Sequence, residues 1–277
     1  MTSPRFGGPW TQAKLDILRQ YLDAYTTALK SQPFNLIYVD GFAGTGSYSE
    51  SRDDYAEFQE FRQGSARIAL EIDNKPFDRV VFIEEDAGAA TSLLQLTNEY
   101  PGRDIHVIQG DANVKVPGFC HGMGDFDRSV VFLDPYATEL SWPTVEVIAA
   151  TKKIDCWILF PRMAITRMMP NEKEPDEATS KQLDRVFGGR EPWQESYQDS
   201  PQYSLFEGEA TRERESGAQI ADRYRKRLEG VFHRVAPASR TLTNSKNVPL
   251  FELFFAAGNP KGAPIAVKMA DYILTKW

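Results

Sequence analysis

The stretch Phe34–Gly46, FNLIYVDGFAGTG, decides the fold class. Its first half is a short apolar run of β-branched and aromatic residues ending at Asp40, which is typical of a buried strand. Its second half is a glycine-rich turn, and glycines lack the Cβ atoms that would keep a ligand away from the backbone. A strand leading into such a turn predicts the edge of a parallel sheet at which α/β proteins bind ligands.

Further strand-like runs follow, with helical patterns between most of them. They are residues 79–84, 105–109, 129–133, 154–160, 231–238 and 250–259. Alternation of this kind is the signature of a parallel sheet. We therefore predict an α/β fold with seven strands, most of them parallel.

The pattern changes after the fifth strand-like run. Residues 161–210 are rich in Met, Glu, Gln and Pro, and only a few stretches have helical spacing. A long segment of this kind inside an otherwise regular domain indicates an insertion or a lid. We predict one domain, residues 1–277, that carries this insertion.

Composition and charge narrow the function classes. The 277 residues are 42% apolar and 26% charged, which is typical of a globular protein. No apolar run reaches the roughly 20 residues that a membrane span needs, and we expect neither a membrane segment nor a secretion signal. The two cysteines, Cys120 and Cys156, suit a reducing cytoplasm. The net charge of −7 argues against a broad surface for duplex phosphates.

Carboxylates stand at the ends of the first four strands. Asp40, Glu84 and Asp134 close three of them, and Asp111 follows the remaining one after a single glycine. In an open parallel sheet these ends line one crevice, so we expect the four carboxylates to converge there. Glu84 is placed to accept hydrogen bonds from the hydroxyls of a ribose. Asp111 is placed either to receive an adenine amino group or to cap a turn.

The glycine-rich turn excludes two common nucleotide-binding motifs. A dinucleotide fingerprint that starts at Gly44 needs a third glycine where Tyr48 or Ser49 stands. A phosphate-binding P-loop needs Gly-Lys followed by Ser or Thr, and neither pair follows this turn. Cys120 and His121 lack further spaced ligands, so we expect no metal site.

The sequence Leu133-Asp134-Pro135-Tyr136 carries the most specific chemistry. An apolar strand delivers a carboxylate, a rigid proline and an aromatic ring to the crevice. Asp134 and a nearby carbonyl can accept both protons of an exocyclic amine, while Tyr136 can stack on a base that has been turned out of its strand. The alternative is an ordinary turn after a strand, since Asp-Pro often begins one.

Together these residues resemble the three-Cys-motif partner proteins, a family of S-adenosylmethionine-dependent methyltransferase type. The resemblance rests on Trp10, Lys14, Tyr21 and Leu22, on YVDGFAGTG, GSARIAL, FIEED, QGDAN, FLDPYA with Trp142, FPRMAITR, Phe187-Gly188, Trp193 and FFAAGNPKG. The order of motifs is also similar to that of the RlmJ type of ribosomal RNA adenine-N6 methyltransferases. One proline precedes Tyr136, where amine-methylating enzymes of that type usually carry two.

The resemblance implies a Rossmann-like class I methyltransferase fold with helices on both faces of the sheet and a helical insertion after the fifth strand. It implies S-adenosylmethionine as the cofactor and Asp134, with Pro135 and Tyr136, at the reacting amine. The implied cofactor contacts are Lys14, Asp40, Gly41, Phe42, Ala43, Gly44, Ser65, Glu84 and Asp111; we add Gly46 and Ala112, which stand in the same two motifs. A cation in the first turn of a helix opposes the helix dipole, which suits Lys14 to hold a methionine carboxylate.

Three functions stay open on the sequence. The first is methyl transfer to an adenine amine in a short RNA or DNA element. The second is a cofactor-binding module that acts with a three-cysteine, radical-type partner protein. The third is methylation of a small molecule or a peptide.

Overall fold

The computed structural model describes residues 9–44, 60–171, 173–203 and 210–276. Its main sheet has eight strands, in the order β3-β2-β1-β4-β5-β10-β8, with β9 paired to β10. These strands are β1 (Asn35–Asp40), β2 (Arg79–Glu84), β3 (Ile105–Gln109), β4 (Asp127–Leu133), β5 (Ile154–Phe160), β8 (Arg234–Val235), β9 (Arg240–Thr243) and β10 (Pro249–Ala257). Strands β1 to β5 are parallel and β10 runs antiparallel to β5. The predicted mostly parallel α/β sheet is confirmed.

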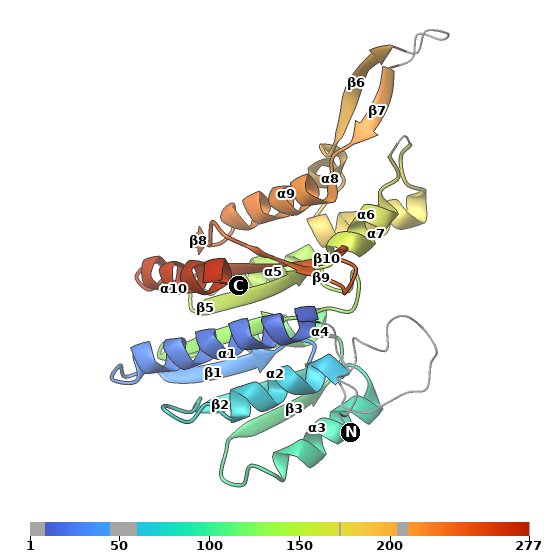
Figure 1. Cartoon of the computed structure of the whole chain (residues 1–277). Helices are drawn as coiled ribbons and strands as arrows, with labels where there is room; N and C mark the ends of the chain where they lie inside the picture. Colours follow the sequence, from blue (N-terminus) through green and yellow to red (C-terminus); the bar gives the residue numbers. More distant parts are fainter. Residues whose placement is uncertain (1–8, 45–59, 172, 204–209, 277) are drawn as a thin grey trace.

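Helices cover both faces of the sheet (Figure 1). They are α1 (Pro9–Leu29), α2 (Glu60–Leu70), α3 (Ala87–Thr97) and α10 (Ala263–Lys276) on one face, and α4 (Ala112–His121), α5 (Trp142–Ala150), α6 (Arg162–Met168), α7 (Glu177–Phe187) and α9 (Gly217–Glu229) on the other. Each face packs its own hydrophobic core, because successive strand residues point to opposite sides. In β4, for example, Phe132 belongs to the first core and Val131 to the second.

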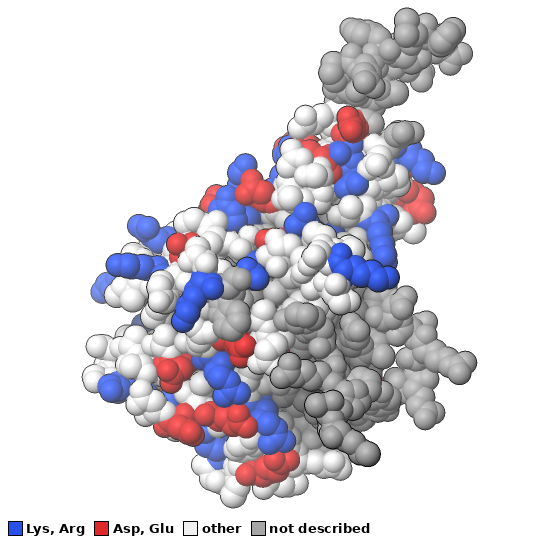
Figure 2. Space-filling model, viewed as in Figure 1, with Lys and Arg blue, Asp and Glu red and all other residues white. Residues whose placement is uncertain are grey.

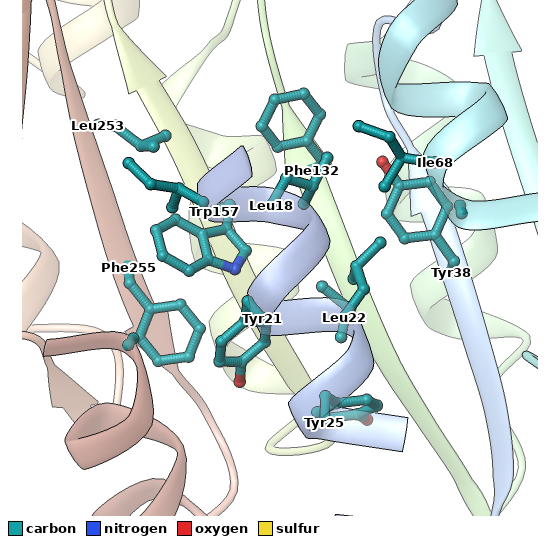
Figure 3. Packing of buried hydrophobic residues seen from close by; sticks show 14 of the residues in the cluster. Leu18, Tyr21, Leu22, Tyr25, Tyr38, Ile68, Phe132, Trp157, Leu253 and Phe255 are labelled. Atoms are coloured by element: carbon teal, nitrogen blue, oxygen red, sulfur yellow. The ribbon is translucent and has the colours of Figure 1, made fainter. Parts of the chain in front are cut away.

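Aromatic residues of α1 anchor that helix to the sheet. Tyr21 is fully buried, and its ring centroid lies 5.3 Å from that of Trp157 and 4.8 Å from that of Phe255 (Figure 3). Large rings at these separations bury much apolar area and fix the orientation of the helix. The second turn of α1, which carries Lys14, is thereby held near the carboxyl end of β4.

The outer edge of the sheet is split into two short strands. β8 pairs with Ala256 and Ala257 of β10, and β9 pairs with its first half. Residues 236–239 lie between the two strands and include Pro237, which has no N–H to donate to a sheet. The sequence pattern predicted one strand over residues 231–238, so the predicted count of seven strands becomes eight in the main sheet.

The segment after β5 is only partly helical. It contains α6, α7 and the short α8 (Glu191–Gln194), then an antiparallel hairpin of β6 (Tyr197–Tyr203) and β7 (Ala210–Arg214) that projects away from the main sheet (Figure 1). The prediction of a helical insertion over residues 161–210 is corrected, because this segment also contains strands of the β6–β7 hairpin. Its two hairpin strands are mostly polar, so the sequence has no alternation of apolar and polar residues there that would indicate strands.

Among the described residues, no helix combines the length and the apolar composition that a membrane crossing requires.

Candidate functional site

A cavity of about 830 Å³ lies at the carboxyl edge of the parallel strands. Its lining includes six of the residues that the sequence predicted for the site, which are Gly41, Phe42, Glu84, Asp111, Ala112 and Tyr136. These residues follow β1, β2, β3 and β4, so the sheet brings together positions that are far apart in the chain. The volume falls within the range of cofactor sites.

Glu84 connects the ends of the first two strands. It is 7% exposed, and its carboxylate accepts one backbone N–H from Gly44 at 2.6 Å and one from Asp86 at 2.9 Å. Gly44 has φ +67°, a left-handed conformation that glycine adopts without strain. Each carboxylate oxygen can accept a second hydrogen bond, so Glu84 retains acceptor capacity toward the cavity.

Asp40 lies beneath the glycine-rich turn and is not part of the cavity lining. Its carboxylate accepts hydrogen bonds from the Tyr38 hydroxyl at 3.3 Å and the Phe42 N–H at 3.4 Å. Burial, chiefly, raises the pKa of Asp40 to about 7, and the charge of Asp134 adds to the rise; a hydrogen bond from Ser65 acts against it. Asp40 and Ser65 therefore support the turn from inside the protein.

Lys14 and Asp134 form a buried ion pair. The Lys14 Nζ lies 2.6 Å from the Asp134 Oδ2, and the two side chains are 1% and 10% exposed. The Lys14 ammonium also lies 5.4 Å from the centroid of the Phe132 ring. The second turn of α1 thus reaches the end of β4, where Lys14 pairs with the Asp134 carboxylate. The sequence suggested Lys14 for a methionine carboxylate and Asp134 for the reacting amine, and the two side chains are direct partners here.

Asp111 caps the helix that begins at the cavity. Its side chain accepts a hydrogen bond from the Asn113 N–H at 2.8 Å, which makes it the N-cap of α4. The sequence left two roles open for Asp111, capping a turn and accepting a hydrogen bond from an adenine amino group. The two roles are compatible, because the carboxylate caps the helix with one oxygen and keeps the other. Ala112, at the first position of the helix, is 5% exposed.

The turn after β4 presents Tyr136, whose side chain is 40% exposed and lines the cavity. The backbone N–H of Tyr136 donates to Glu139 at 3.1 Å. Arg185, from α7, donates to the carbonyls of Thr138 at 3.2 Å and Glu139 at 2.7 Å. The segment after β5 therefore clamps this turn and brings a cation to the cavity.

Sequence reasoning missed several lining residues, chiefly Asn113, Glu139 and Arg185. Asn113 belongs to the predicted QGDAN motif, but its side chain holds the next helix: its amide donates to the Glu139 carbonyl at 2.9 Å and its Oδ1 accepts from Ser141. Arg185 had no sequence signal, because its role depends on how α7 docks.

Ala43 and Pro135 do not line this cavity. Ala43 is buried and donates its N–H to the Ile83 carbonyl at 2.9 Å. Pro135 lines a separate, much smaller cavity beside Leu140 and Ile158. Gly46 lies outside the described residues.

No family model and no curated protein matches the chain. The chain is similar to the solved structure of protein LPL1258 from Legionella pneumophila, with 14% identity and a TM-score of 0.53 over 98% of this chain and 93% of that one. It is less similar to a putative methyltransferase, YhhF, from Escherichia coli (13% identity, TM-score 0.31, 71% and 86% covered) and to the N-terminal domain of EvdMO1, solved with S-adenosylhomocysteine and D-fucose (9% identity, TM-score 0.39, 87% and 82% covered). At these identities the likeness concerns the fold alone, an α/β fold with a mostly parallel sheet.

Proposed function

We propose that the chain is an S-adenosylmethionine-dependent methyltransferase that acts on an exocyclic amine, adenine N6, of a short RNA or DNA element. The observation that carries the proposal is the position of the 830 Å³ cavity. It opens at the carboxyl edge of β1, β2 and β3, directly beside the Asp134-Pro135-Tyr136 turn after β4.

The cavity residues fit an S-adenosyl group. Glu84 offers carboxylate oxygens for ribose hydroxyls at the end of β2. Phe42, Ile83 and Ala112 supply apolar surface for an adenine ring, and Asp111 offers an acceptor for its amino group. Such a cofactor supplies a methyl group that its sulfonium already activates, so the chain has only to align the acceptor and stabilise charge.

Asp134 holds the acceptor amine in this proposal. A carboxylate that accepts a hydrogen bond from the amine N–H orients the nitrogen lone pair toward the methyl group that it attacks. Lys14 pairs with Asp134 at 2.6 Å and restricts the orientation of its carboxylate. Tyr136, at the rim, offers an exposed ring on which a flipped base can stack.

Surface charge favours a short acceptor element over a long duplex. Lys and Arg are interspersed with Asp and Glu over the described part of the face seen in Figure 2. Several of these charges pair with each other, as Arg67 does with Glu99 and Arg79 with Asp104. Because phosphate binding depends on unpaired cations, contact with nucleic acid on this face would be local.

The Lys14–Asp134 pair also favours a second candidate, in which the chain binds the cofactor for a three-cysteine partner protein and transfers no methyl itself. In the described residues Asp134 is covered by Lys14 and does not line the cavity. A carboxylate committed to an internal ion pair needs no acceptor amine.

The first experiment measures cofactor binding. Titration calorimetry should give one site for S-adenosylmethionine and one for S-adenosylhomocysteine. Glu84→Gln should weaken both by about tenfold or more, because a neutral amide accepts ribose hydrogen bonds less strongly than a carboxylate. Glu191→Gln, at an exposed position outside the cavity lining, is the matched control and should change affinity little.

The second experiment separates the two functions. Radiolabelled methyl transfer is measured with total RNA, DNA and protein, and the product is treated with nuclease. The methyltransferase function is supported if nuclease treatment removes the label from the product. It also requires that Asp134→Asn gives no labelled product although it binds the cofactor as tightly as the wild type does. Cofactor binding without any transfer supports the partner-dependent module. Label that stays with protein indicates a peptide acceptor.

A further inference from the structure

A second cavity, of about 450 Å³, lies between α1 and α10 at the other end of the parallel strands. Its lining includes Arg128 near the start of β4, Asp155 near the start of β5 and Asn259 after the end of β10. These positions mark the amino ends of the parallel strands, whereas the 830 Å³ cavity stands at the carboxyl ends. The two cavities share no lining residue among those described.

The floor of this cavity carries two polar groups in a buried setting. Asp155 is 8% exposed, and its Oδ2 accepts a hydrogen bond from the Tyr21 hydroxyl at 2.8 Å. Tyr25, one turn further along α1 (Figure 3), is 5% exposed, and within the described chain its hydroxyl has no hydrogen-bond partner. Tyr25 lines the cavity, so its hydroxyl can donate a hydrogen bond to a ligand there or accept one from it.

The walls are apolar and the rim is cationic. Leu29, Ile265 and Met269 supply the apolar surface, and the lining also carries three cations, Arg128, Lys153 and Lys261. Lys153 lies 3.5 Å from Asp125, a weak pair because the Asp125 side chain is 98% exposed. Arg128 is held in place, because its guanidinium lies 4.1 Å from the centroid of the Phe34 ring and donates to the Asp127 carbonyl at 2.6 Å. A local excess of cations in a chain of net charge −7 points to an anionic group on the ligand.

One ligand class meets all three conditions. It has a flat apolar body for the walls, adjacent N–H donors for the Asp155 carboxylate and an anion for the rim. A guanine base presents two parallel N–H donors, N1–H and N2–H, which match a carboxylate, whereas adenine presents one amino group beside an acceptor nitrogen. Its 5′-phosphate supplies the anion for Lys and Arg.

We propose that the cavity between α1 and α10 is a binding site for a guanine mononucleotide, with the base on Asp155 and Tyr25 and the phosphate at Arg128, Lys153 and Lys261. This site is separate from the proposed methyltransferase site. It does not depend on the proposed function.

Calorimetric titration with guanosine 5′-monophosphate tests the site in the full chain, with S-adenosylhomocysteine at saturation so that the other cavity is filled. One molecule per chain is expected to bind, at least tenfold more tightly than adenosine 5′-monophosphate. If S-adenosylhomocysteine itself fails to bind, the proposed function falls while the nucleotide titration still tests this cavity.

Matched variants locate the binding. Tyr25→Phe removes only the hydroxyl and should weaken binding about threefold to tenfold. Lys261→Gln should weaken it and reduce its salt dependence. Lys268→Gln, an exposed α10 residue outside the cavity lining, is the control and should leave affinity unchanged.

Asp155→Asn tests the base preference, and its thermal midpoint verifies that the variant is folded. It should reduce the preference for the guanine nucleotide over the adenine nucleotide. The proposal is overturned if no nucleotide binds at millimolar concentration, if both nucleotides bind the wild type equally, or if Tyr25→Phe and Lys261→Gln bind as the wild type does.

Discussion

At the scale of single residues, the Lys14–Asp134 pair is the most consequential contact of the site. Both side chains are nearly inaccessible to solvent, and their charged atoms lie 2.6 Å apart. Removing one partner of a buried pair leaves the other charge without compensation, which costs far more than losing a surface pair. The pair therefore links the stability of the fold to the chemistry proposed at Asp134.

We predict that Lys14→Met lowers the free energy of unfolding by about 3–5 kcal/mol, because the Asp134 carboxylate becomes a buried, unpaired charge. Urea denaturation followed by circular dichroism measures this change. The double variant Lys14→Met with Asp134→Asn should recover part of the loss, since the charge is then gone. A loss below about 1 kcal/mol in the single variant would show that water reaches the carboxylate.

At the scale of elements, α7 contributes Arg185 to the lining of the 830 Å³ cavity. The helix ends at Gly188, whose φ is +74°, and it brings Arg185 to the turn after β4. A Cβ built at Gly188 would lie 2.3 Å from Cδ1 of Trp142, the first residue of α5. The end of α7 thus fits against α5 only when this position has no side chain.

We predict that Gly188→Ala destabilises the protein by about 2–5 kcal/mol, because left-handed backbone strain and overpacking against Trp142 act together. Gly102→Ala is the matched control. Gly102 has φ +88° with nothing within 4 Å of an added Cβ, so only strain of about 1 kcal/mol is expected there. Equal losses in the two variants, measured by chemical denaturation, would contradict the close packing of α7 on α5.

At the scale of the whole molecule, two buried acids lie near opposite ends of the parallel strands. Asp40 stands at the end of β1 and Asp155 near the start of β5. Burial raises the pKa of each to about 7, from 3.8. Between these values the folded protein holds more protons than the unfolded chain. The contribution of both acids to stability therefore decreases as the pH rises from about 4 to about 7 and is constant above that range.

We predict that Asp155→Asn raises the thermal midpoint, relative to the wild type, by a few degrees more at pH 8 than at pH 5. The variant removes the cost of a buried charge, and its amide oxygen still accepts the hydrogen bond from Tyr21. Scanning calorimetry at the two pH values measures the difference. The same change at both values would mean that Asp155 titrates normally in the folded protein.

The sequence by itself determined the sheet and one edge of the site. Apolar runs and the residues that end them predicted β1 to β5, because local pattern and strand burial agree there. The convergence of Glu84, Asp111 and Tyr136 on one cavity followed from parallel topology, since every carboxyl end then points the same way. The split edge strand and the β6–β7 hairpin escaped prediction, because their patterns are short and polar.

Only the tertiary structure decided which side chains meet. The sequence could not show that Lys14 pairs with Asp134, that Arg185 clamps the turn after β4, or that Tyr25 and Asp155 share a cavity. Each of these contacts joins residues from different elements, and how helices dock on a sheet depends on side-chain packing across the whole core. Periodicity along the chain specifies which face of an element is buried, but not which neighbour covers it.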